Sequence, residues 1–516
     1  MTTPRQFRWA AAALVLTFAS TLTGHGAQSP VKGLTSPDGL AKAYDLVYNA
    51  DFEAAETELT RACGPAPREA CDVVRAASLW WRLYLDLDNH SLDQTFNTSI
   101  EQTILGCERW TVRDPQRAEA WFYLGAAYGA RVQYHAQRDE YLAAARDGKR
   151  VKGALEKTLS LDPLIQDANF GIGMYEYYAD AAPAALKFLR WLLLLPGGDK
   201  VKGLRQMVQA GTQGVLLKSE AAYQLHFVYL WYEKNPEGAL ALLEQLRTRY
   251  PGNPMFRLNL AQVHEGYLGD RLAALTIYLE LIAAARGGTL AEAELGETWG
   301  RLGAAEQFSA LAEADRAVEQ LRPIVERKPV KPYGAVARAH LGLGQAYDRL
   351  GERAKAVAEY RAAQASAPAD DPRGIRKAAL DAQTRTPDAR AADADRLSLE
   401  GWREFERGAI SEAIARLDRA VAISPGDGVH RYRRGRALEA SGDRPRALAD
   451  YQRAIQARPA PPAPMLAAAC VGSGRLYDAA GDRERALSSY QWAARVRGAD
   501  AATRDAAALA LARLRR

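Results

Sequence analysis

The residues that could do chemistry in this chain do not stand at the spacings that known catalytic motifs need. His264-Glu265 could begin a zinc-protease helix, but Leu268 occupies the position of its second histidine. Gly472-Ser-Gly474 does not have the Gly-x-Ser-x-Gly form of a nucleophile elbow. No glycine-rich loop ends in Gly-Lys-Ser or Gly-Lys-Thr, so the sequence has no Walker loop. The sequence therefore predicts a protein that is not an enzyme and that uses no metal or cofactor.

Four cysteines could do redox chemistry, although none has the spacing of a zinc site. Cys63 and Cys71 flank Gly-Pro-Ala-Pro between two predicted helices, so they could close that turn as a disulfide, or they could remain reduced. Cys107 and Cys470 fall at positions that are typical of a helical core. We expect those two to be buried thiols.

A central aromatic segment is the best candidate for binding an apolar ligand. Tyr175 and Tyr178 precede Pro183, and Phe188 and Trp191 follow within an apolar run. The twelve residues from 184 to 195 are too few to cross a bilayer, but they could line a pocket or lie at a membrane interface. The alternative is a helix buried on nearly all sides, which the sequence favours.

The elements that position these residues are predicted by a spacing that recurs along the chain. Two small residues and a larger one between them stand at offsets of 0, 4 and 7, usually with a proline at offset 12, and two glycines lie twelve and five residues upstream. The sets are Ala356, Tyr360, Ala363 and Pro368; Ala413, Leu417, Ala420 and Pro425; Ala447, Tyr451, Ala454 and Pro459; and Ala486, Tyr490 and Ala493, where Gly498 replaces the proline. Their glycines are Gly344 and Gly351, Gly401 and Gly408, Gly435 and Gly442, and Gly474 and Gly481.

These offsets have a direct physical meaning. Residues at 0, 4 and 7 share one face of a helix, because an α-helix has 3.6 residues per turn. The first glycine opens space where two helices cross, the second lies at the turn between them, and the proline ends the second helix. The period from Ala413 to Ala447 is 34 residues, which predicts stacked helix pairs that bury their apolar faces against one another.

These residues resemble the tetratricopeptide repeat family. The resemblance implies an all-α fold, a right-handed superhelical solenoid of roughly eleven antiparallel helix pairs. It is close in the last repeats and weaker elsewhere, but it covers most of the chain. The weaker sets are Phe52, Ala55, Leu59 and Ala62; Thr103, Cys107, Trp110 and Pro115; Val151, Leu155, Thr158 and Pro163; Ala239, Leu243, Leu246 and Pro251; and Ala317, Leu321, Ile324 and Pro329.

The resemblance also implies where a partner would bind, because the first helices of such pairs line a concave groove. On this register the groove of the C-terminal array presents five aromatic and arginine side chains, which could hold an extended peptide or a helix. For Phe405 and Tyr432, packing between helix pairs is an equal alternative. The five predicted residues are Trp402, Phe405, Tyr432, Arg436 and Arg475.

The organisation of the chain follows from its composition. Residues 1–27 read as a signal peptide, with Arg5 and Arg8 before an apolar stretch and cleavage near Gly26 or Ala27. The first cysteine is Cys63, which argues against a lipoprotein, so we expect export to the periplasm with no transmembrane span in the mature chain. We predict a divergent array over 28–368, a linker or bridging helix over 369–394, and a regular array with a capping helix over 395–516.

The charge is unevenly distributed. The formal net charge is +6, but 431–516 alone carries 17 arginines against 8 acidic residues, a net of +9. That end could face an anionic envelope component, or it could simply be a solvated arginine-rich surface. An exported protein rarely meets nucleic acid. We therefore predict a non-catalytic scaffold of the bacterial envelope that binds a protein partner of unknown identity. The alternative is a protein that binds a lipid or another apolar ligand through 170–195.

Overall fold

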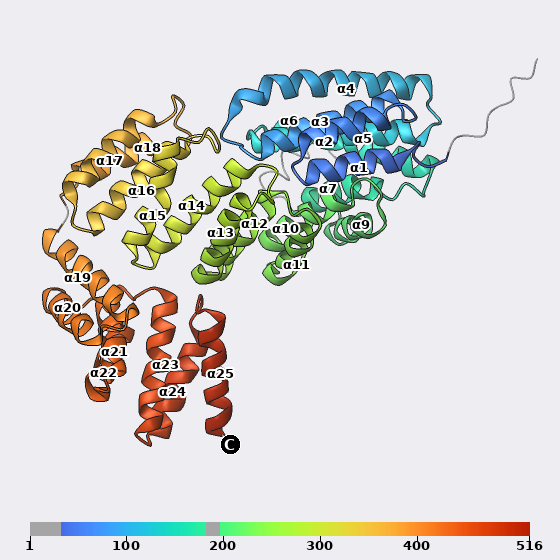
Figure 1. Ribbon diagram of the computed structural model, residues 1–516. Coiled ribbons are helices and arrows are strands. Elements are labelled where there is room, and N and C mark those ends of the chain that lie inside the picture. Colours follow the sequence, from blue (N-terminus) through green and yellow to red (C-terminus); the bar gives the residue numbers. More distant parts are fainter. Residues whose placement is uncertain (1–31, 182–196, 387, 516) are drawn as a thin grey trace, which may run out of the picture.

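The computed structural model describes residues 32–181, 197–386 and 388–515, and within these ranges the chain is all helical. Twenty-four α-helices follow one another in the described residues, and each except the couple α18 and α19 packs against the next in the chain (Figure 1). This confirms the predicted helical solenoid. The predicted signal peptide lies outside the described residues, as do Phe188 and Trp191 of the predicted apolar site. None of the described helices is long and apolar enough to cross a membrane.

The first part of the solenoid winds from the N-terminus to the middle of the chain. Asp51, Asn235, Asn253 and Asp270 each cap a helix here by accepting a backbone N–H with the side chain. The helices are α1 (Pro37–Tyr48), α2 (Phe52–Ala62), α3 (Arg68–Tyr84), η1 (His90–Leu92), α4 (Asp93–Arg113), α5 (Ala118–Gln137), α6 (Tyr141–Leu161), α7 (Ala168–Ala181), α9 (Lys200–Gln213), α10 (Lys218–Trp231), α11 (Pro236–Arg249), α12 (Pro254–Gln262), the π-helical η2 (Val263–Leu268) and α13 (Arg271–Arg286).

The second part of the solenoid consists of the middle helices, which continue the same winding, and of the C-terminal array. The middle helices are α14 (Ala293–Ala310), α15 (Ala314–Arg327), α16 (Ala335–Arg349), α17 (Arg353–Ser366) and α18 (Ile375–Thr384). The C-terminal helices are α19 (Ala389–Glu406), α20 (Ile410–Ile423), α21 (Gly428–Ala440), α22 (Arg444–Gln456), α23 (Ala463–Ala479), α24 (Arg483–Arg495) and α25 (Ala501–Arg515). Over the described ranges the α-helices form eleven consecutive pairs. Helices α18 and α25 do not belong to a pair, and each packs against the pair before it.

The recurring spacing corresponds to one structural unit. Ala413, Leu417 and Ala420 on α20 are fully buried, and the matching residues of α17, α22 and α24 are no more than 3% exposed. The first glycine of each set lies at the helix crossing: a Cβ on Gly344 would come within 2.4 Å of the ring of Tyr360. The second glycine forms the turn, and Gly351 has a φ of +75° that favours glycine. The small residues therefore set how closely the helices of a pair approach.

The weaker sets occupy the same buried positions. Thr103, Cys107 and Trp110 face the core from α4, and Leu155 and Thr158 do so from α6. Pro163 keeps the offset of 12 from Val151, but α5 and α6 are 20 and 21 residues long, whereas α21 and α22 have 13 residues each. Longer helices, rather than an inserted loop, therefore account for the irregular N-terminal period.

The segment predicted as a linker or bridging helix, 369–394, contains α18 and the first turn of α19. Helix α18 packs against α16 and α17. The guanidinium of Arg353 on α17 donates to the carbonyl oxygens of Ala382, Gln383 and Arg385 at 3.2, 2.6 and 2.7 Å. Because these carbonyls lie at the end of α18 and have no partner within the helix, Arg353 caps it.

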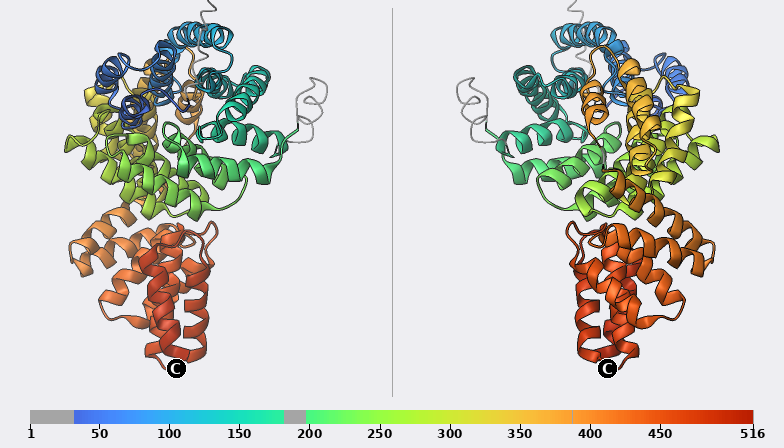
Figure 2. Two further views of the ribbon diagram at one scale, coloured as in Figure 1. Left: turned by 90° about the vertical axis from the view of Figure 1, so that its right-hand side faces the viewer. Right: turned by 90° about the vertical axis from the view of Figure 1, so that its left-hand side faces the viewer.

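The solenoid winds tightly enough that distant segments touch. Near its start, the Asn253 side chain donates to the carbonyl of Tyr48 at 2.8 Å, so α12 lies against the end of α1. Further along, the backbone N–H of Tyr333 donates to the carboxylate of Asp86 at 3.0 Å. The C-terminal array, drawn in orange to red, lies beneath the rest of the molecule in Figures 1 and 2.

The cysteines divide into one bonded pair and two buried thiols. Cys63 and Cys71 form a disulfide across the α2–α3 turn, with their Cα atoms 5.9 Å apart. Cys107 and Cys470 are free and fully buried. Burial raises the pKa of each of these two thiols to about 12, so both stay protonated at neutral pH.

Candidate protein-binding surface of the C-terminal array

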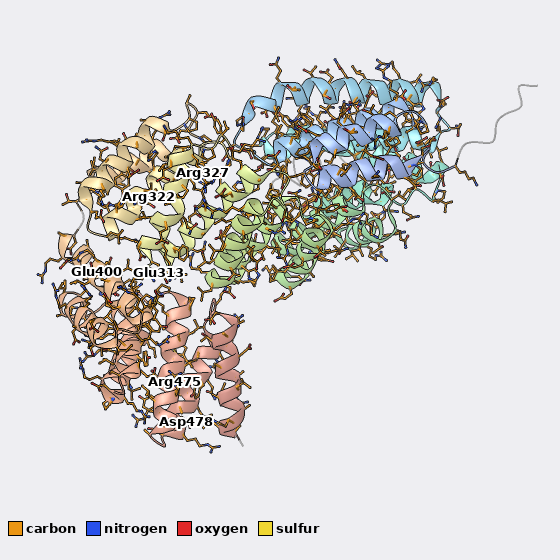
Figure 3. The ribbon with its side chains drawn as sticks, in the orientation of Figure 1. Glu313, Arg322, Arg327, Glu400, Arg475 and Asp478 are labelled. Atoms are coloured by element: carbon orange, nitrogen blue, oxygen red, sulfur yellow. A yellow bond between two sulfur atoms is a disulfide. The ribbon has the colours of Figure 1, made fainter. Side chains whose placement is uncertain are left out.

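The predicted groove residues stand on the first helices of three successive pairs. Trp402 and Phe405 are three residues apart on α19, and Tyr432 and Arg436 are four apart on α21, so each couple shares a helix face. Arg475 follows on α23, which packs against α21 and α22 (Figure 3). The helical register thus aligns all five side chains in the order α19, α21, α23.

The structure brings four of these side chains into one cluster. The rings of Trp402 and Phe405 stack, with centroids 5.0 Å apart and an angle of 21° between their planes. The Arg436 guanidinium carbon lies 5.7 Å from the centre of the Phe405 ring, and its Nη1 donates to the hydroxyl of Tyr432 at 3.1 Å. Arg436 therefore lies over an aromatic face, so that the aromatic and arginine side chains of this cluster are in contact with one another.

Burial separates the residues that can touch a partner from those that cannot. Tyr432 is only 6% exposed and packs with Tyr451, Leu438 and Met465, so it supports the surface from beneath. Trp402, Phe405 and Arg436 are partly exposed. We use the term ring cluster for Trp402, Phe405 and Arg436 with Tyr432 beneath them.

Arg475 extends this surface as an exposed cation. Its side chain is 58% exposed, and its Nε and Nη2 donate to Oε1 of Glu439 at 2.9 and 2.6 Å. The other oxygen of Glu439 accepts from the hydroxyl of Tyr451 at 2.7 Å. Burial, and then this hydrogen bond, raise the pKa of Tyr451 well above its usual value. Glu439 therefore accepts from two donors, Arg475 and Tyr451.

A polar cavity lies where the C-terminal array meets the α14–α15 turn. It has a volume of about 170 Å³ and is lined by Arg433, a residue that the sequence did not single out. Arg433 is 1% exposed, and its Nη2 and Nη1 donate to the carbonyl of Ala312 at 2.8 Å and to Oγ of Ser398 at 3.2 Å. Burial lowers the pKa of Arg433 to about 10. In the sequence, the only signal for Arg433 is the face of helix α21 on which it falls.

Three potential metal ligands line the same polar cavity. One ligand atom from each of Asp395, Asp427 and His430 lies within 4.8 Å of the other two. These groups already have partners, since Asp427 accepts from two backbone N–H groups as the N-cap of α21, and His430 Nε2 lies 3.0 Å from Asp395 Oδ1. Arg433 adds a positive charge beside them. The arrangement fits a helix cap and an ion pair that join α19 to α21.

The central aromatic residues are held by their neighbours in the fold. Lys152 places its Nζ 5.2 Å from the centre of the Tyr175 ring. Tyr178 meets Tyr177 and Tyr232 edge to face, at centroid distances of 5.6 and 5.5 Å. Neither Tyr175 nor Tyr178 lines the polar cavity.

Many arginines of the basic C-terminal end are paired. Arg431 and Arg434 both bind the buried carboxylate of Asp450, and Arg513 binds Asp478. Several exposed arginines without a carboxylate partner among the described contacts lie on the second helices. They include Arg444, Arg453 and Arg495.

Comparison with known proteins agrees with this geometry. The family model for the tetratricopeptide repeat matches residues 337–370, which span α16 and α17. No curated protein matches the chain. Similar solved structures include a tetratricopeptide repeat protein from Parabacteroides merdae, with 16% identity, 57% of this chain and 98% of that chain covered, and a TM-score of 0.26.

Two further structures have the same kind of likeness. The TPR2AB domain of yeast Sti1, in its complex with pHSP90, has 16% identity over 58% of this chain and 99% of that chain, with a TM-score of 0.21. A thermophilic protein of Thermus thermophilus has 18% identity over 57% and 99%, with a TM-score of 0.19. Residues 337–370 therefore match one tetratricopeptide repeat, and the stacked helix pairs of the described residues have the architecture of such repeats.

Proposed function

We propose that this chain is a non-catalytic scaffold of the bacterial cell envelope and that it binds a partner protein across the ring cluster and Arg475. Arrays of tetratricopeptide repeats support an interaction role, because stacked repeats present a long surface rather than an enclosed site. The N-terminal sequence supports export, with cleavage near residue 26 or 27 and a periplasmic location.

The observation that carries the binding site is the partly exposed Trp402–Phe405 stack with Arg436 against it. Tryptophan and arginine are enriched among the residues that dominate binding energy at protein interfaces. Rings already held by Arg436 and Tyr432 lose little side-chain entropy on binding. A peptide segment that offers an apolar side chain to the rings and a carboxylate to Arg475 fits this surface.

Crosslinked capture from envelope extract tests the site. The mature chain from residue 28 is compared with a triple variant, Trp402→Ala, Arg436→Ala and Arg475→Ala. We expect the intact chain to capture a protein that the variant loses. The affinity of the purified partner is then measured for both chains. Each alanine change at a central interface residue should weaken the binding free energy by about 2 kcal/mol or more.

The second helices offer a matched control. Trp492→Ala, Arg419→Ala and Arg361→Ala remove one tryptophan and two arginines from exposed positions on α24, α20 and α17. We expect this control to bind as the intact chain does. If both triple variants lose the partner equally, or if neither does, the proposed surface is wrong.

We also propose that the exposed arginines of α22 and α24 face an anionic envelope component. The support is the net charge of the region and the absence of carboxylate contacts at Arg444, Arg453 and Arg495 in the described structure. Binding to anionic vesicles should weaken as salt rises. Binding that does not depend on salt would contradict this proposal.

A further inference from the structure

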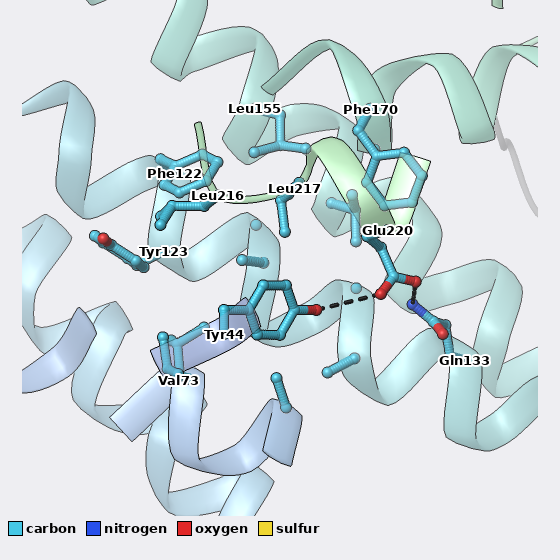
Figure 4. Close-up of a pocket in the computed structure, with 18 of the residues that line it drawn as sticks. Tyr44, Val73, Phe122, Tyr123, Gln133, Leu155, Phe170, Leu216, Leu217 and Glu220 are labelled. Carbon is cyan, nitrogen blue, oxygen red and sulfur yellow. Dashed lines mark hydrogen bonds between the residues drawn. The ribbon is translucent and has the colours of Figure 1, made fainter. Parts of the chain in front are cut away.

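The N-terminal array encloses a cavity whose walls are almost wholly apolar (Figure 4). It lies among α1, α3, α5, α6, α7 and the start of α10, and its volume is about 80 Å³. Protein interiors are normally packed as densely as organic crystals, so a void of this size is an exception that needs a cause. Its larger side chains include Val73, Phe122, Leu155, Phe170, Leu216 and Leu217.

The cavity exists because one face of α5 carries only glycine and alanine over two turns. Gly125, Ala126, Gly129 and Ala130 all line it. The space beside Gly125 is occupied, as it is at the other crossing glycines, since a Cβ on Gly125 would come within 2.5 Å of Leu155. One turn later a Cβ on Gly129 would meet nothing within 4 Å. The sequence thus leaves open a space that one larger residue on α5 would fill.

The one carboxylate in the wall is already satisfied. Glu220 accepts from the hydroxyls of Tyr44 and Tyr48 at one oxygen and from the side-chain amides of Gln133 and Gln224 at the other. Four donors match the roughly four lone-pair sites of a carboxylate. Figure 4 shows two of these bonds at the polar end of the cavity. A ligand therefore finds no free acceptor on Glu220 and must bind through apolar contact.

The lip of the cavity is partly open. Ala77 on α3, Ala126, Gly129 and Ala130 on α5, and Leu217 before α10 are each partly exposed, whereas Phe122 and Leu155 deeper inside are at most 2% exposed. A ligand could thus place its end inside while the rest of the molecule stays in solvent.

We propose that this cavity binds the end of an unbranched alkyl chain. Its volume is roughly half the 150 Å³ of an engineered apolar cavity that holds benzene, so a slim chain fits better than a ring. Free fatty acids and the acyl tails of membrane lipids share this chemistry. The site lies on α5 and is separate from the ring cluster, so it does not rest on the proposed partner surface.

Calorimetric titration with straight-chain carboxylates tests the site in the mature chain. From hexanoate to decanoate the affinity should rise by roughly fourfold for each added methylene that the cavity takes up. Gly129→Leu should fill the space and weaken decanoate binding roughly tenfold or more. Ala126→Leu narrows the same wall and covers the case in which the first variant misfolds.

Gly153→Leu is the matched control. Gly153 is also a glycine within a long helix, α6, and a Cβ there meets nothing within 4 Å, but the residue is exposed and does not line the cavity. It should bind decanoate as the wild type does. The proposal is overturned if the wild type shows no saturable binding of decanoate, or if folded Gly129→Leu and Ala126→Leu both bind as tightly as Gly153→Leu.

Flotation with zwitterionic phosphatidylcholine vesicles, which offer no net charge to the C-terminal arginines, distinguishes the two sources of the chain. Flotation that Gly129→Leu abolishes would indicate that the acyl tail comes from membrane lipid. Decanoate binding without flotation would indicate a free fatty acid, and both results support an alkyl site. The triple variant at Trp402, Arg436 and Arg475 should keep decanoate binding, so failure of the partner proposal would remain distinguishable.

Discussion

Arg403 on α19 holds Asp315 on α15 through two hydrogen bonds, from Nε at 2.7 Å and from Nη2 at 2.8 Å. The same guanidinium also reaches Glu313 at 3.0 Å. These contacts place several charge-assisted bonds at the junction of the two arrays, where Figure 3 labels Glu313. Arg403 therefore joins the C-terminal array to α15 and the turn before it, as Arg433 does through the carbonyl of Ala312.

Removing that arginine should loosen the junction. Arg403→Ala removes the guanidinium partner of Asp315 and leaves Glu313 paired with Arg316 alone, and hydrogen bonds to charged groups contribute about 1.5–3 kcal/mol each. We expect faster tryptic cleavage after Arg385, between α18 and α19, and a larger radius of gyration in X-ray scattering. Arg407→Ala is the control, because Arg407 is exposed and pairs only within α19. Equal cleavage rates for the two variants would show that Arg403 does not hold the junction.

The helix crossings make a prediction about glycine. Gly344→Ala should lower the free energy of unfolding by about 1–3 kcal/mol, because its Cβ would overlap the buried ring of Tyr360. That ring cannot move freely, since its hydroxyl donates to Asp348 at 2.8 Å. Gly153→Ala, on an exposed helix face, should instead raise stability by up to about 1 kcal/mol. Urea unfolding followed by circular dichroism measures both, and a stabilised Gly344→Ala would be inconsistent with this packing.

These crossings also show how much of the fold could be predicted from the sequence. Ala356, Tyr360 and Ala363 were predicted to share a buried face, and they are all within 1% of full burial. Such predictions succeed because helix pairing is local and repeats every few tens of residues. Trp402 and Arg436 were placed on first helices by the same periodicity.

Contacts between distant turns of the solenoid could not be predicted in this way. Gly498 was recognised only as a substitute for a proline, yet a Cβ there would lie 2.4 Å from the carbonyl oxygen of Gly269. That approach joins residues 229 positions apart, and no periodic pattern encodes it. The apolar cavity has the same origin, since its walls come from helices between Tyr44 and Glu220.

The disulfide between Cys63 and Cys71 should contribute measurably to stability. Its ends are 8 residues apart, and closing a loop of that length in the unfolded chain corresponds to about 2.5 kcal/mol in the chain-entropy treatment. Cys63→Ser with Cys71→Ser should therefore unfold at lower urea, and the intact chain in reductant should match it. Cys107→Ala, which removes a buried thiol instead, should leave the effect of reductant unchanged. If reductant does not alter unfolding of the intact chain, the bond contributes nothing.

His226 should make the protein less stable in mild acid. It is 1% exposed on α10, and burial lowers its pKa to about 3, although its Nδ1 donates to the carbonyl of Tyr223. The unfolded chain takes up a proton near the ordinary histidine pKa of about 6.5, whereas the folded chain does not until about pH 3. The contribution of the neutral His226 to the free energy of unfolding is therefore fully present above about pH 6.5. It falls as the pH drops toward 3, and the loss is about 2 kcal/mol at pH 5.

Urea unfolding at pH 7.5 and pH 5.0 measures this loss. His226→Leu has no proton to take up, so its unfolding free energy should fall by about 2 kcal/mol less than that of the wild type between the two conditions. His90→Gln is the control, because the His90 side chain is 53% exposed. The difference between wild type and His226→Leu isolates one residue from every other group that titrates. Parallel losses in those two proteins would mean that His226 can be protonated without unfolding.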